Sequence, residues 1–319
     1  MKRWIVGIDI GGTKIAVSVG NKTGVISGRT VFSSERGRKV NQSIEKLKRS
    51  IEFLFDEHKI KRSDVLGVGV GVPGAIDPAS QIILKSPNLP SWEGIPLRKI
   101  LRQKLGLPIS IENDASAAAL GEFFFGAGRG IKNFIYITVS TGIGSGIVAN
   151  GELLRGEKGS AGEVGHMTMV RNGNHCPCGK KGCLEAYSSG TAIASYVKAA
   201  LRNGKKSQFF KRIKLDQISG QLVSQAAQKG DSLAIEARTQ AADFLGIALA
   251  NLINLLNPKR IILGGGVMEQ PQNFWQPMMK AAKRESWPLA FKACEITRSK
   301  LGTYVGDLGA MALVLENRK

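Results

Sequence analysis

Three of the chain's four cysteines lie within eight residues, and a histidine precedes the first of them by ten positions. The four residues are His166, Cys176, Cys178 and Cys183. One imidazole and three thiolates are ligands of the kind that tetrahedral Zn²⁺ prefers. Two glycines among the cysteines permit a tight loop in which the thiolates converge. The spacing therefore predicts a zinc site formed by these four side chains.

The predicted zinc is structural rather than catalytic, because protein ligands fill all four positions and leave none for a reactive water. Glu163 stands three residues before His166, and Glu185 stands two residues after Cys183. Two carboxylates thus bracket the metal-binding segment. We infer that the metal holds a loop that carries functional acids.

Three glycine-rich turns each follow an apolar stretch that predicts a β-strand. They are Gly11-Gly12-Thr13, Thr141-Gly142-Ile143-Gly144 and Gly264-Gly265-Gly266. Glycine lets backbone amides approach phosphate oxygens closely, and a threonine hydroxyl adds a donor. One such turn is typical of any tight connection, whereas three together favour a nucleotide site. None matches a Walker A loop or a Rossmann fingerprint, so we expect a nucleotide held between two domains.

Two charged residues flank the first of these turns. Asp9 precedes it, where a carboxylate could orient Mg²⁺ through water beside the phosphates, or could simply cap the turn. Lys14 follows it and has two interpretations as well, a phosphate contact or an exposed strand residue.

Asp114 is the candidate general base. It follows a predicted strand and precedes an alanine-rich helix, and its neighbour Asn113 is suited to binding a sugar hydroxyl. A carboxylate in this position could take the proton from a hydroxyl whose oxygen attacks the γ-phosphate of ATP. Alternatively, Asp114 is the N-cap of the following helix, a role worth about 1 kcal/mol.

Composition limits the class of protein. With 43% apolar and 22% charged residues, the 319-residue chain has room for two hydrophobic cores. No apolar run reaches the roughly 20 residues that span a bilayer, and the start of the chain leads into a strand without a cleavage site. We therefore expect no membrane partner and no signal peptide. Clustered cysteines with one outlier, Cys294, favour a reducing cytoplasm over a disulfide framework.

The net charge of +20 raises the question of nucleic acid. The basic residues are spread along the chain, and their densest segments do not alternate with aromatic residues as a base-stacking surface would. A solvated basic surface is the expected explanation, with attraction of a phosphorylated anion such as ATP as the alternative.

Strands and helices alternate along the chain, which predicts a largely parallel sheet whose ligands lie beyond the carboxyl ends of its strands. The strands are expected at residues 5–10, 65–72, 108–111, 134–139 and 260–263, and the helices near 44–55, 97–105, 115–124, 231–256 and 305–315. A strand, turn, strand pattern recurs in the two halves. We therefore expect two related α/β domains, a small one of residues 1–114 plus about 305–319, and a larger one of residues 115–304 that carries the zinc loop.

An ordered series of segments covering essentially the whole chain closely resembles the ROK family of sugar kinases and sugar-responsive repressors, and within it the ATP-dependent glucokinases. The segments are Asp9-x-Gly-Gly-Thr-Lys14, Gly71-Val-Pro-Gly74, Pro87-Asn88-Leu89, Glu112-Asn-Asp-Ala-Ser-Ala-Ala-Ala-Leu-Gly-Glu122, Ser140-Thr-Gly-Ile-Gly144, Glu163-x-x-His166 and the Cys176–Glu185 cluster. The cysteine cluster followed by Glu185 is the most specific of them.

The resemblance implies an actin-like, ribonuclease-H-like fold of two domains that close over a hexose and ATP with Mg²⁺. It implies that Asp114 is the base for the terminal hydroxyl of the sugar. It further implies that the other hydroxyls contact Asn113, Glu163, His166 and Glu185, with Gly74 and Asn88 nearby. The turns at Gly11–Thr13 and Thr141–Gly144 would bind phosphates, and Gly264–Gly266 would lie against adenosine. Family members are often dimers or tetramers, so we expect a homodimer or homotetramer.

Several acceptors and activities stay open. Glucose is the expected sugar, partly because Ala75 stands where N-acetylmannosamine kinases of the family tend to carry arginine. N-acetylglucosamine, N-acetylmannosamine, fructose or mannose as acceptor, and polyphosphate as donor, are alternatives. A repressor that senses the same sugar is a further one. Repressors of the family carry an N-terminal helix-turn-helix, whereas eight residues precede Asp9, so we expect a kinase.

Overall fold

The computed structural model describes residues 3–34, 40–86, 89–269 and 274–316. The chain forms two compact units, which we describe separately. Unit 1 comprises Met1–Lys132, Gly146–Gly162 and Ser299–Lys319, and unit 2 comprises Asn133–Ser145 and Glu163–Arg298. The predicted domain limits at residues 114 and about 305 stay a prediction.

Unit 1 is built on a five-stranded sheet of order β3-β2-β1-β4-β7. The first three strands pair antiparallel, whereas β1, β4 and β7 run parallel. The strands are β1 (Trp4–Ile10), β2 (Lys14–Asn21), β3 (Ile26–Ser33), β4 (Val65–Val72) and β7 (Ile109–Asn113). Short strands β5 (Ala75–Ile76) and β6 (Ile83–Lys85) form a separate hairpin.

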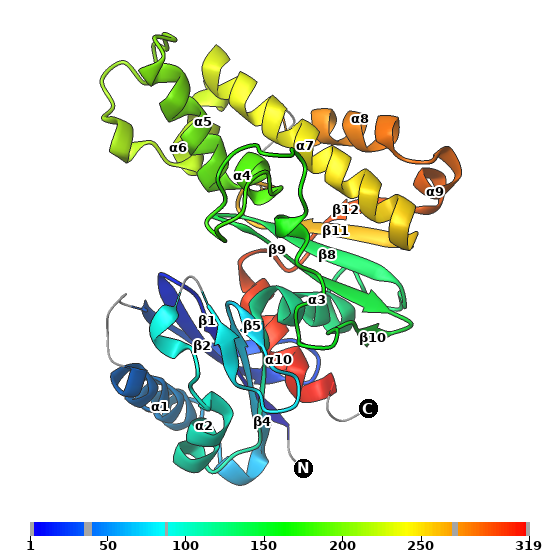
Figure 1. The fold of residues 1–319 in the computed structure, drawn as a ribbon. Helices are drawn as coiled ribbons and strands as arrows, with labels where there is room; N and C mark the ends of the chain where they lie inside the picture. Colours follow the sequence, from blue (N-terminus) through cyan, green and yellow to red (C-terminus); the bar gives the residue numbers. More distant parts are fainter. Residues whose placement is uncertain (1–2, 35–39, 87–88, 270–273, 317–319) are drawn as a thin grey trace. The chain divides into compact units, whose positions relative to one another are not determined.

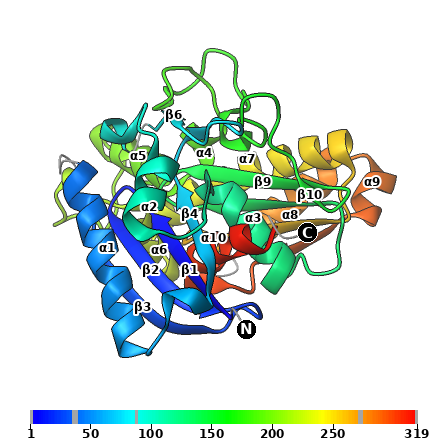
Figure 2. The same ribbon diagram turned by 90° about the horizontal axis from the view of Figure 1, so that it is seen from below.

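Helices cover both faces of this sheet. Helices α1 (Val40–Glu57) and α2 (Leu97–Leu105) lie on one face, and α3 (Asp114–Phe125) and α10 (Val305–Glu316) lie on the other (Figure 1). The buried residues of α1 recur at helical spacing, and α1 lies alongside β2 and β3 (Figure 2). The amphipathic pattern of α1 and α2 is what the sequence predicts for helices that cover a sheet.

The alternation of valine and glycine in β4 determines how closely α10 approaches the sheet. All eight residues of β4 are buried. A side chain at Gly69 would place its Cβ 1.7 Å from the carbonyl oxygen of Ala310 in α10, so only glycine fits there. Helix α10 is therefore held directly against strand β4 of unit 1.

Unit 2 carries strands of a second five-stranded sheet, of order β10-β9-β8-β11-β12. Strands β8, β11 and β12 run parallel. The strands are β8 (Phe134–Val139), β9 (Ile143–Ala149), β10 (Glu152–Leu153), β11 (Arg260–Gly264) and β12 (Glu295–Arg298). The chain leaves unit 2 within β9, after Ser145.

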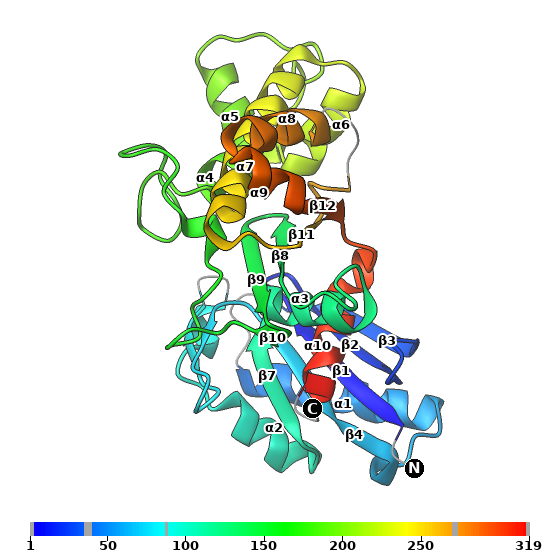
Figure 3. The ribbon, with the colours of Figure 1, turned by 90° about the vertical axis from the view of Figure 1, so that its right-hand side faces the viewer.

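The helices of unit 2 gather around its longest one, α7 (Ser232–Leu256), which packs mainly on α8 (Figure 3). The others are α4 (Glu185–Ser188), α5 (Gly190–Arg202), α6 (Gly220–Gln228), α8 (Trp275–Glu285) and α9 (Pro288–Ala293). Asp231 caps α7 by accepting a hydrogen bond from the amide of Ala234, and Asn257 ends it with a φ of 42°. These two residues explain why the predicted helix starts and stops where it does.

Helix α7 is also the one helix of the described segments whose length and composition would allow it to cross a membrane. Half of its most apolar stretch is buried, and α4, α5, α6 and α8 pack against it. This packing is that of the central helix of a globular unit.

Candidate active site

The carboxyl ends of the parallel strands β1, β4 and β7 meet at one edge of the unit 1 sheet. Asp9 of β1 pairs with Gly71 of β4, and Val72 pairs with Asn113 of β7. A Cβ at Gly71 would lie 3.7 Å from the Cα of Asp114 and 4.0 Å from Oδ1 of Asp9. The fold therefore brings together the predicted Mg²⁺-orienting carboxylate and the predicted base, on either side of a glycine.

The start of α3 settles which residue caps it. Oδ1 of Asn113 accepts hydrogen bonds from the amides of Ala115 (2.9 Å) and Ser116 (3.1 Å), so Asn113 is the N-cap. Asp114 is the first residue of the helix, and its Oδ1 accepts a hydrogen bond from the Ala115 amide at 2.9 Å. The alternative of Asp114 as N-cap is therefore wrong. The positive end of the helix dipole instead favours the ionised form of this carboxylate.

Asn113 also links the end of β7 to Gly74. Its Nδ2 donates to the carbonyl oxygen of Gly74 at 3.0 Å. Gly74 has a φ of +108°, and a Cβ there would lie 2.1 Å from the carbonyl oxygen of Lys85, so both backbone conformation and space require glycine. The predicted sugar-binding residue Asn88 lies outside the described residues.

Asp9 lies in a negative and poorly solvated environment. Burial raises its pKa from 3.8 to about 7, and repulsion from Asp114 and Asp307 adds to the effect, while Lys14 and Arg29 oppose it. Nε of Arg29 donates to both carboxylate oxygens of Asp307, at 3.2 and 3.1 Å. Asp307 and Arg29 are 278 positions apart, and no local pattern in the sequence marked either as part of this edge.

The first glycine turn closes the β1–β2 hairpin. The amide of Gly11 donates to the carbonyl oxygen of Lys14 at 2.9 Å, and Ser34 donates to the carbonyl oxygen of Thr13 at 3.0 Å. Gly12 and Thr13 form the tip, and Lys14 is an exposed residue at the start of β2. The turn thus lies next to Asp9, as its position in the sequence implies.

One of the predicted sugar-binding acids contacts the second glycine turn. Oε2 of Glu185, the first residue of α4, accepts a hydrogen bond from the amide of Ile143 at 2.8 Å. A Cβ at Gly142 would lie 2.5 Å from the same oxygen. The turn is shorter than predicted, because β9 begins at Ile143 and Gly144 therefore lies in a strand. Thr141 and Gly142 remain at its tip.

The third glycine turn lies beside the second in unit 2. Gly264 is the last residue of β11 and pairs with Thr138 of β8, so the loops after both strands leave the same edge of the sheet. Gly265 has a φ of +88°, and a Cβ there would lie 2.5 Å from the carbonyl oxygen of Val139. Gly266 follows in the same turn, where a Cβ would meet no atom within 4 Å.

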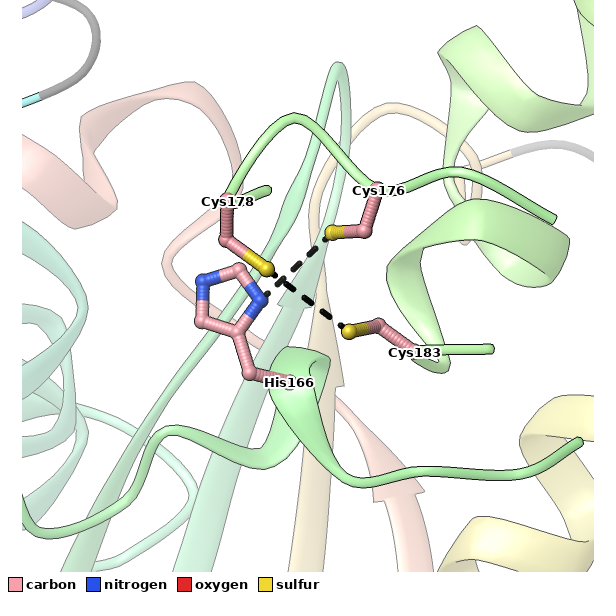
Figure 4. Close-up of side chains that lie close together, drawn as sticks. All are labelled: His166, Cys176, Cys178 and Cys183. Atoms are coloured by element: carbon pink, nitrogen blue, oxygen red, sulfur yellow. Dashed lines mark hydrogen bonds between the residues drawn. The ribbon is translucent and has the colours of Figure 1, made fainter. Parts of the chain in front are cut away.

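The predicted metal ligands converge. Ligand atoms of His166, Cys176, Cys178 and Cys183 all lie within 4.8 Å of one another (Figure 4). The Sγ atoms of Cys178 and Cys183 are 3.7 Å apart, and Sγ of Cys176 is 3.8 Å from Nδ1 of His166. A tetrahedron with bonds of about 2.3 Å has edges of about 3.8 Å, so these separations fit Zn²⁺. Cys294 is buried and stands outside this group.

His166 presents its two ring nitrogens to different neighbours. Nδ1 faces the cysteine sulfurs, and Nε2 lies 3.9 Å from Oε2 of Glu163. The metal-binding nitrogen and the nitrogen available to a ligand are therefore distinct. In unit 2 the predicted sugar-binding residues Glu163 and His166 are thus neighbours of each other.

A partly buried ion-pair network supports strand β7, which ends just before Asp114. Glu112, 7% exposed, accepts hydrogen bonds from the Asn113 amide (2.9 Å) and from Nε of Arg155 (2.7 Å). Arg155 also donates to Glu316 of α10 at 2.6 Å. Burial raises the pKa of Glu112, and Arg155 opposes this shift. Arg155 and Glu316 could not be found from the sequence, because neither lies in a recognisable motif.

Comparisons with known proteins identify the family of this chain. The ROK family model matches residues 5–317. Glucokinase of Halalkalibacterium halodurans is 35% identical over 317 residues, which cover 98% of this chain and 95% of that protein. The xylose repressor of Caldicellulosiruptor bescii is 34% identical over 320 residues, which cover 98% of this chain and 78% of the repressor.

A solved structure shows the same architecture. The ROK family glucokinase of Streptomyces griseus, in complex with glucose and AMPPNP, matches with a TM-score of 0.82 at 33% identity, covering 98% of this chain and 99% of the other. The predicted fold class is confirmed, including a cluster of three cysteines and one histidine that suits a structural zinc. This chain belongs to the ROK family and has the two-domain α/β fold of its sugar kinases.

Proposed function

We propose that this ROK-family sugar kinase transfers the γ-phosphoryl group of ATP to the 6-hydroxyl of a hexose, and that the hexose is glucose. The observation that carries the proposal is the pair of carboxylates, Asp9 and Asp114, at one strand edge on either side of Gly71. Phosphoryl transfer needs one group to accept the hydroxyl proton and a second to organise charge on the phosphates. The glucokinase relatives and the glucose complex from Streptomyces griseus support the choice of reaction and sugar.

Asp114 is the proposed base. The Ala115 amide orients its carboxylate, and the positive amino end of α3 stabilises negative charge at this position. As the 6-oxygen of the sugar attacks the γ-phosphorus, the hydroxyl proton passes to Asp114 and the bond from phosphorus to the β,γ-bridging oxygen breaks. ADP leaves with the electron pair of that bond.

Asp9 and the glycine turns are the proposed phosphate-binding groups. Mg²⁺ bound with ATP would neutralise charge on the β- and γ-phosphates, and Asp9 would orient it through water. Thr13 and the amides of Gly11 and Gly12 are assigned to phosphate oxygens. Lys14 is exposed at the adjacent strand start and is assigned a phosphate contact as well.

Unit 2 supplies the remaining proposed contacts. Thr141 and Gly142 are assigned to phosphate, and Gly264–Gly266 to the adenosine. Glu163, His166 and Glu185 are assigned to sugar hydroxyls, together with Asn113 and Gly74 of unit 1. Zn²⁺ would hold the loop from His166 to Cys183 so that the ring of His166 and the carboxylate of Glu163 keep their orientation.

Two other functions have specific support. An N-acetylhexosamine or fructose acceptor would use the same base and phosphate groups, and one hydroxyl or methylene changes sugar discrimination by only about 1–3 kcal/mol. A sugar-responsive repressor is supported by the 34% identity to a xylose repressor. The kinase is favoured because the chain keeps both carboxylates and all three glycine turns.

The acceptor is tested by ADP release in a coupled assay with ATP and a panel of glucose, mannose, fructose, N-acetylglucosamine, N-acetylmannosamine and xylose. We expect the highest kcat/KM with glucose. Preference for an N-acetylated sugar or fructose would retain the mechanism and replace the substrate. Sugar binding without turnover for every member of the panel would contradict the kinase proposal, and operator-DNA binding would then be measured.

A further inference from the structure

A cavity of about 660 Å³ lies in unit 1 at the amino-terminal ends of β4 and β7. Its walls include Leu66 near the start of β4, Pro108 just before β7, and Val314 of α10. The residues proposed for catalysis follow the carboxyl ends of the same two strands. At about 3.3 Å per residue, Gly67 lies roughly 17 Å from Val72 along β4 and Ser110 lies roughly 10 Å from Asn113 along β7, so the cavity and the proposed active site lie at opposite ends of these strands.

The charged residues that line this cavity are all basic among the described residues. Arg98 and Arg102 of α2 line it, and both also line a second cavity of about 600 Å³ that includes Lys99. None of these three side chains is ion-paired with a described acidic residue. Arg98 and Arg102 are four residues apart on one helix, a spacing at which like charges repel each other.

Another basic residue of the same helix provides a contrast. Lys104 is paired with Glu45 of α1 and does not line either cavity. The unbalanced positive charge of α2 is therefore concentrated where the helix borders the cavities.

The cavity also has oriented polar groups. Nε of Arg98 donates to the carbonyl oxygen of Ile109 at 3.2 Å, which fixes the plane of its guanidinium. Gln81 lines the cavity in a left-handed conformation, with φ of 54°, and its Oε1 is buried with no hydrogen-bond partner among the described residues. Ser80 and Gln103 line the adjoining cavity.

We propose that this cavity is a second binding site, and that its ligand is a small phosphorylated molecule. Two guanidinium groups match the several oxygens of a phosphate dianion, which they can bind through paired hydrogen bonds. Neutral polar side chains beside them, Gln81 first among these, suit hydroxyl groups, and the side chains of Leu66, Leu107 and Val314 form an apolar part of the lining. A volume of about 660 Å³ is that of a typical small-molecule site.

The proposal is tested by isothermal titration calorimetry of the full-length chain. The probes are inorganic phosphate, glucose 6-phosphate and AMP, which distinguish free phosphate from a phosphorylated sugar and a nucleotide. Unphosphorylated glucose is the negative probe. The variants are Arg98→Gln and Arg102→Gln, with Lys104→Gln as the matched control on the same helix. Circular dichroism establishes that each variant is folded.

We expect at least one phosphorylated probe to bind the wild-type chain, and each arginine variant to weaken that binding at least tenfold. Lys104→Gln should stay within twofold of the wild type. Equal affinity in both arginine variants and the wild type would overturn the proposal, because the probe would then bind elsewhere, including at the proposed active site. An equal loss of affinity in Lys104→Gln would also overturn the proposal, because it would show unspecific attraction of the probe to a basic surface. Absence of binding by all three phosphorylated probes would also refute it.

Discussion

At the scale of single residues, Asp9 combines a proposed role in phosphate binding with a cost to the stability of the fold. It is held beside Asp114 and Asp307, and only Lys14 and Arg29 offset the repulsion. Carboxylates crowded in this way are typical of sites that bind a cation or do acid–base work. Burial and this repulsion together raise the pKa of Asp9 to about 7, so its ionised form is destabilised in the ligand-free protein.

We predict that Asp9→Asn stabilises the ligand-free protein at neutral pH while it impairs catalysis. The pKa of Asp9 rises on folding from 3.8 to about 7, so its contribution to stability is complete below about pH 4 and is lost as the pH rises through 7. Asparagine cannot ionise. The difference in Tm between variant and wild type should therefore grow from pH 4 to pH 7 and then level off.

The measurement is thermal unfolding followed by circular dichroism at a series of pH values without nucleotide or Mg²⁺. Asp56→Asn, at an exposed position in α1, is the control and should show no such trend. A Tm difference for Asp9→Asn that is independent of pH would contradict the assignment of the raised pKa.

Arg155 is the second residue whose role can be isolated. Its removal leaves the carboxyl group of Glu112 buried and without its cationic partner, and breaking such a pair by removing one member costs about 3 kcal/mol or more. We predict that Arg155→Met lowers the free energy of unfolding by about that amount. Adding Glu112→Gln to this variant should restore much of the lost free energy of unfolding, because the buried carboxyl group without a partner is then removed.

Urea denaturation of the two single variants and the double variant measures this coupling. Lys48→Met is the comparison, because Lys48 forms an exposed ion pair with Glu52 and such pairs contribute under about 1 kcal/mol. Additive effects of the Arg155 and Glu112 substitutions would show that the pair does not act as a unit.

At the scale of elements, the sequence allowed most of the architecture to be predicted. The strands at residues 5–10, 65–72 and 134–139 and the helix ending at Leu256 are confirmed within one residue or so, because their apolar periodicity and end signals agree. The second glycine turn was predicted too long. Strand pairing along β9 takes Gly144 into the sheet although glycine favours turns, and such pairing partners are not visible locally.

The zinc loop was predictable as a ligand set, since its four residues are close in sequence. The contact between Glu185 and the second glycine turn could not be predicted, because its hydrogen bond with the amide of Ile143 joins residues 42 positions apart. The same holds for Asp307 beside Asp9 and for Glu316 with Arg155, which depend on the packing of the C-terminal helix α10. Local sequence patterns identify residues that could serve a site, and long-range packing decides which of these residues come into contact.

The cysteine cluster supports a prediction at this scale. Cys178→Ser should remove bound zinc, lower Tm and raise the KM for the sugar about tenfold or more, because the loop that holds His166 and Glu163 loses its anchor. The KM for ATP should change less. Metal content by atomic absorption, calorimetric Tm and steady-state kinetics together check these expectations.

Cys294→Ser is the matched control for the zinc loop. Cys294 is buried outside the cluster, and its replacement by serine is the same chemical change, so the zinc content and the sugar KM of this variant should stay near wild type. Loss of zinc from Cys178→Ser with no change in sugar KM would show that the loop serves stability alone.

At the scale of the whole molecule, the chain shares one fold with kinases and with repressors of similar sequence. Its 35% identity to a glucokinase and 34% identity to a xylose repressor are too close to separate the two activities. The fold does not distinguish these two activities, so individual side chains have to decide between them. In the proposed mechanism Asp114 is the side chain on which phosphoryl transfer depends, whereas sugar binding alone does not require a base.

The net charge of +20 belongs to this scale as well. The basic residues are distributed over both units, and several of them pair with acidic neighbours, as Arg260 does with Glu295 and Lys205 with Glu236. The cytoplasmic location and the dimeric or tetrameric state stay predictions, since neither can be derived from a single chain.

The most direct test compares wild type with Asp114→Asn for ATP-dependent formation of glucose 6-phosphate, identified by ³¹P NMR, with Asp56→Asn as control. We predict that Asp114→Asn lowers kcat by about 10²–10⁴-fold while glucose binding stays near wild type, because the proton acceptor is lost and the amide keeps the shape of the carboxyl group. Turnover by Asp114→Asn at a near wild-type rate, or no glucose 6-phosphate from the wild-type chain, would contradict the account.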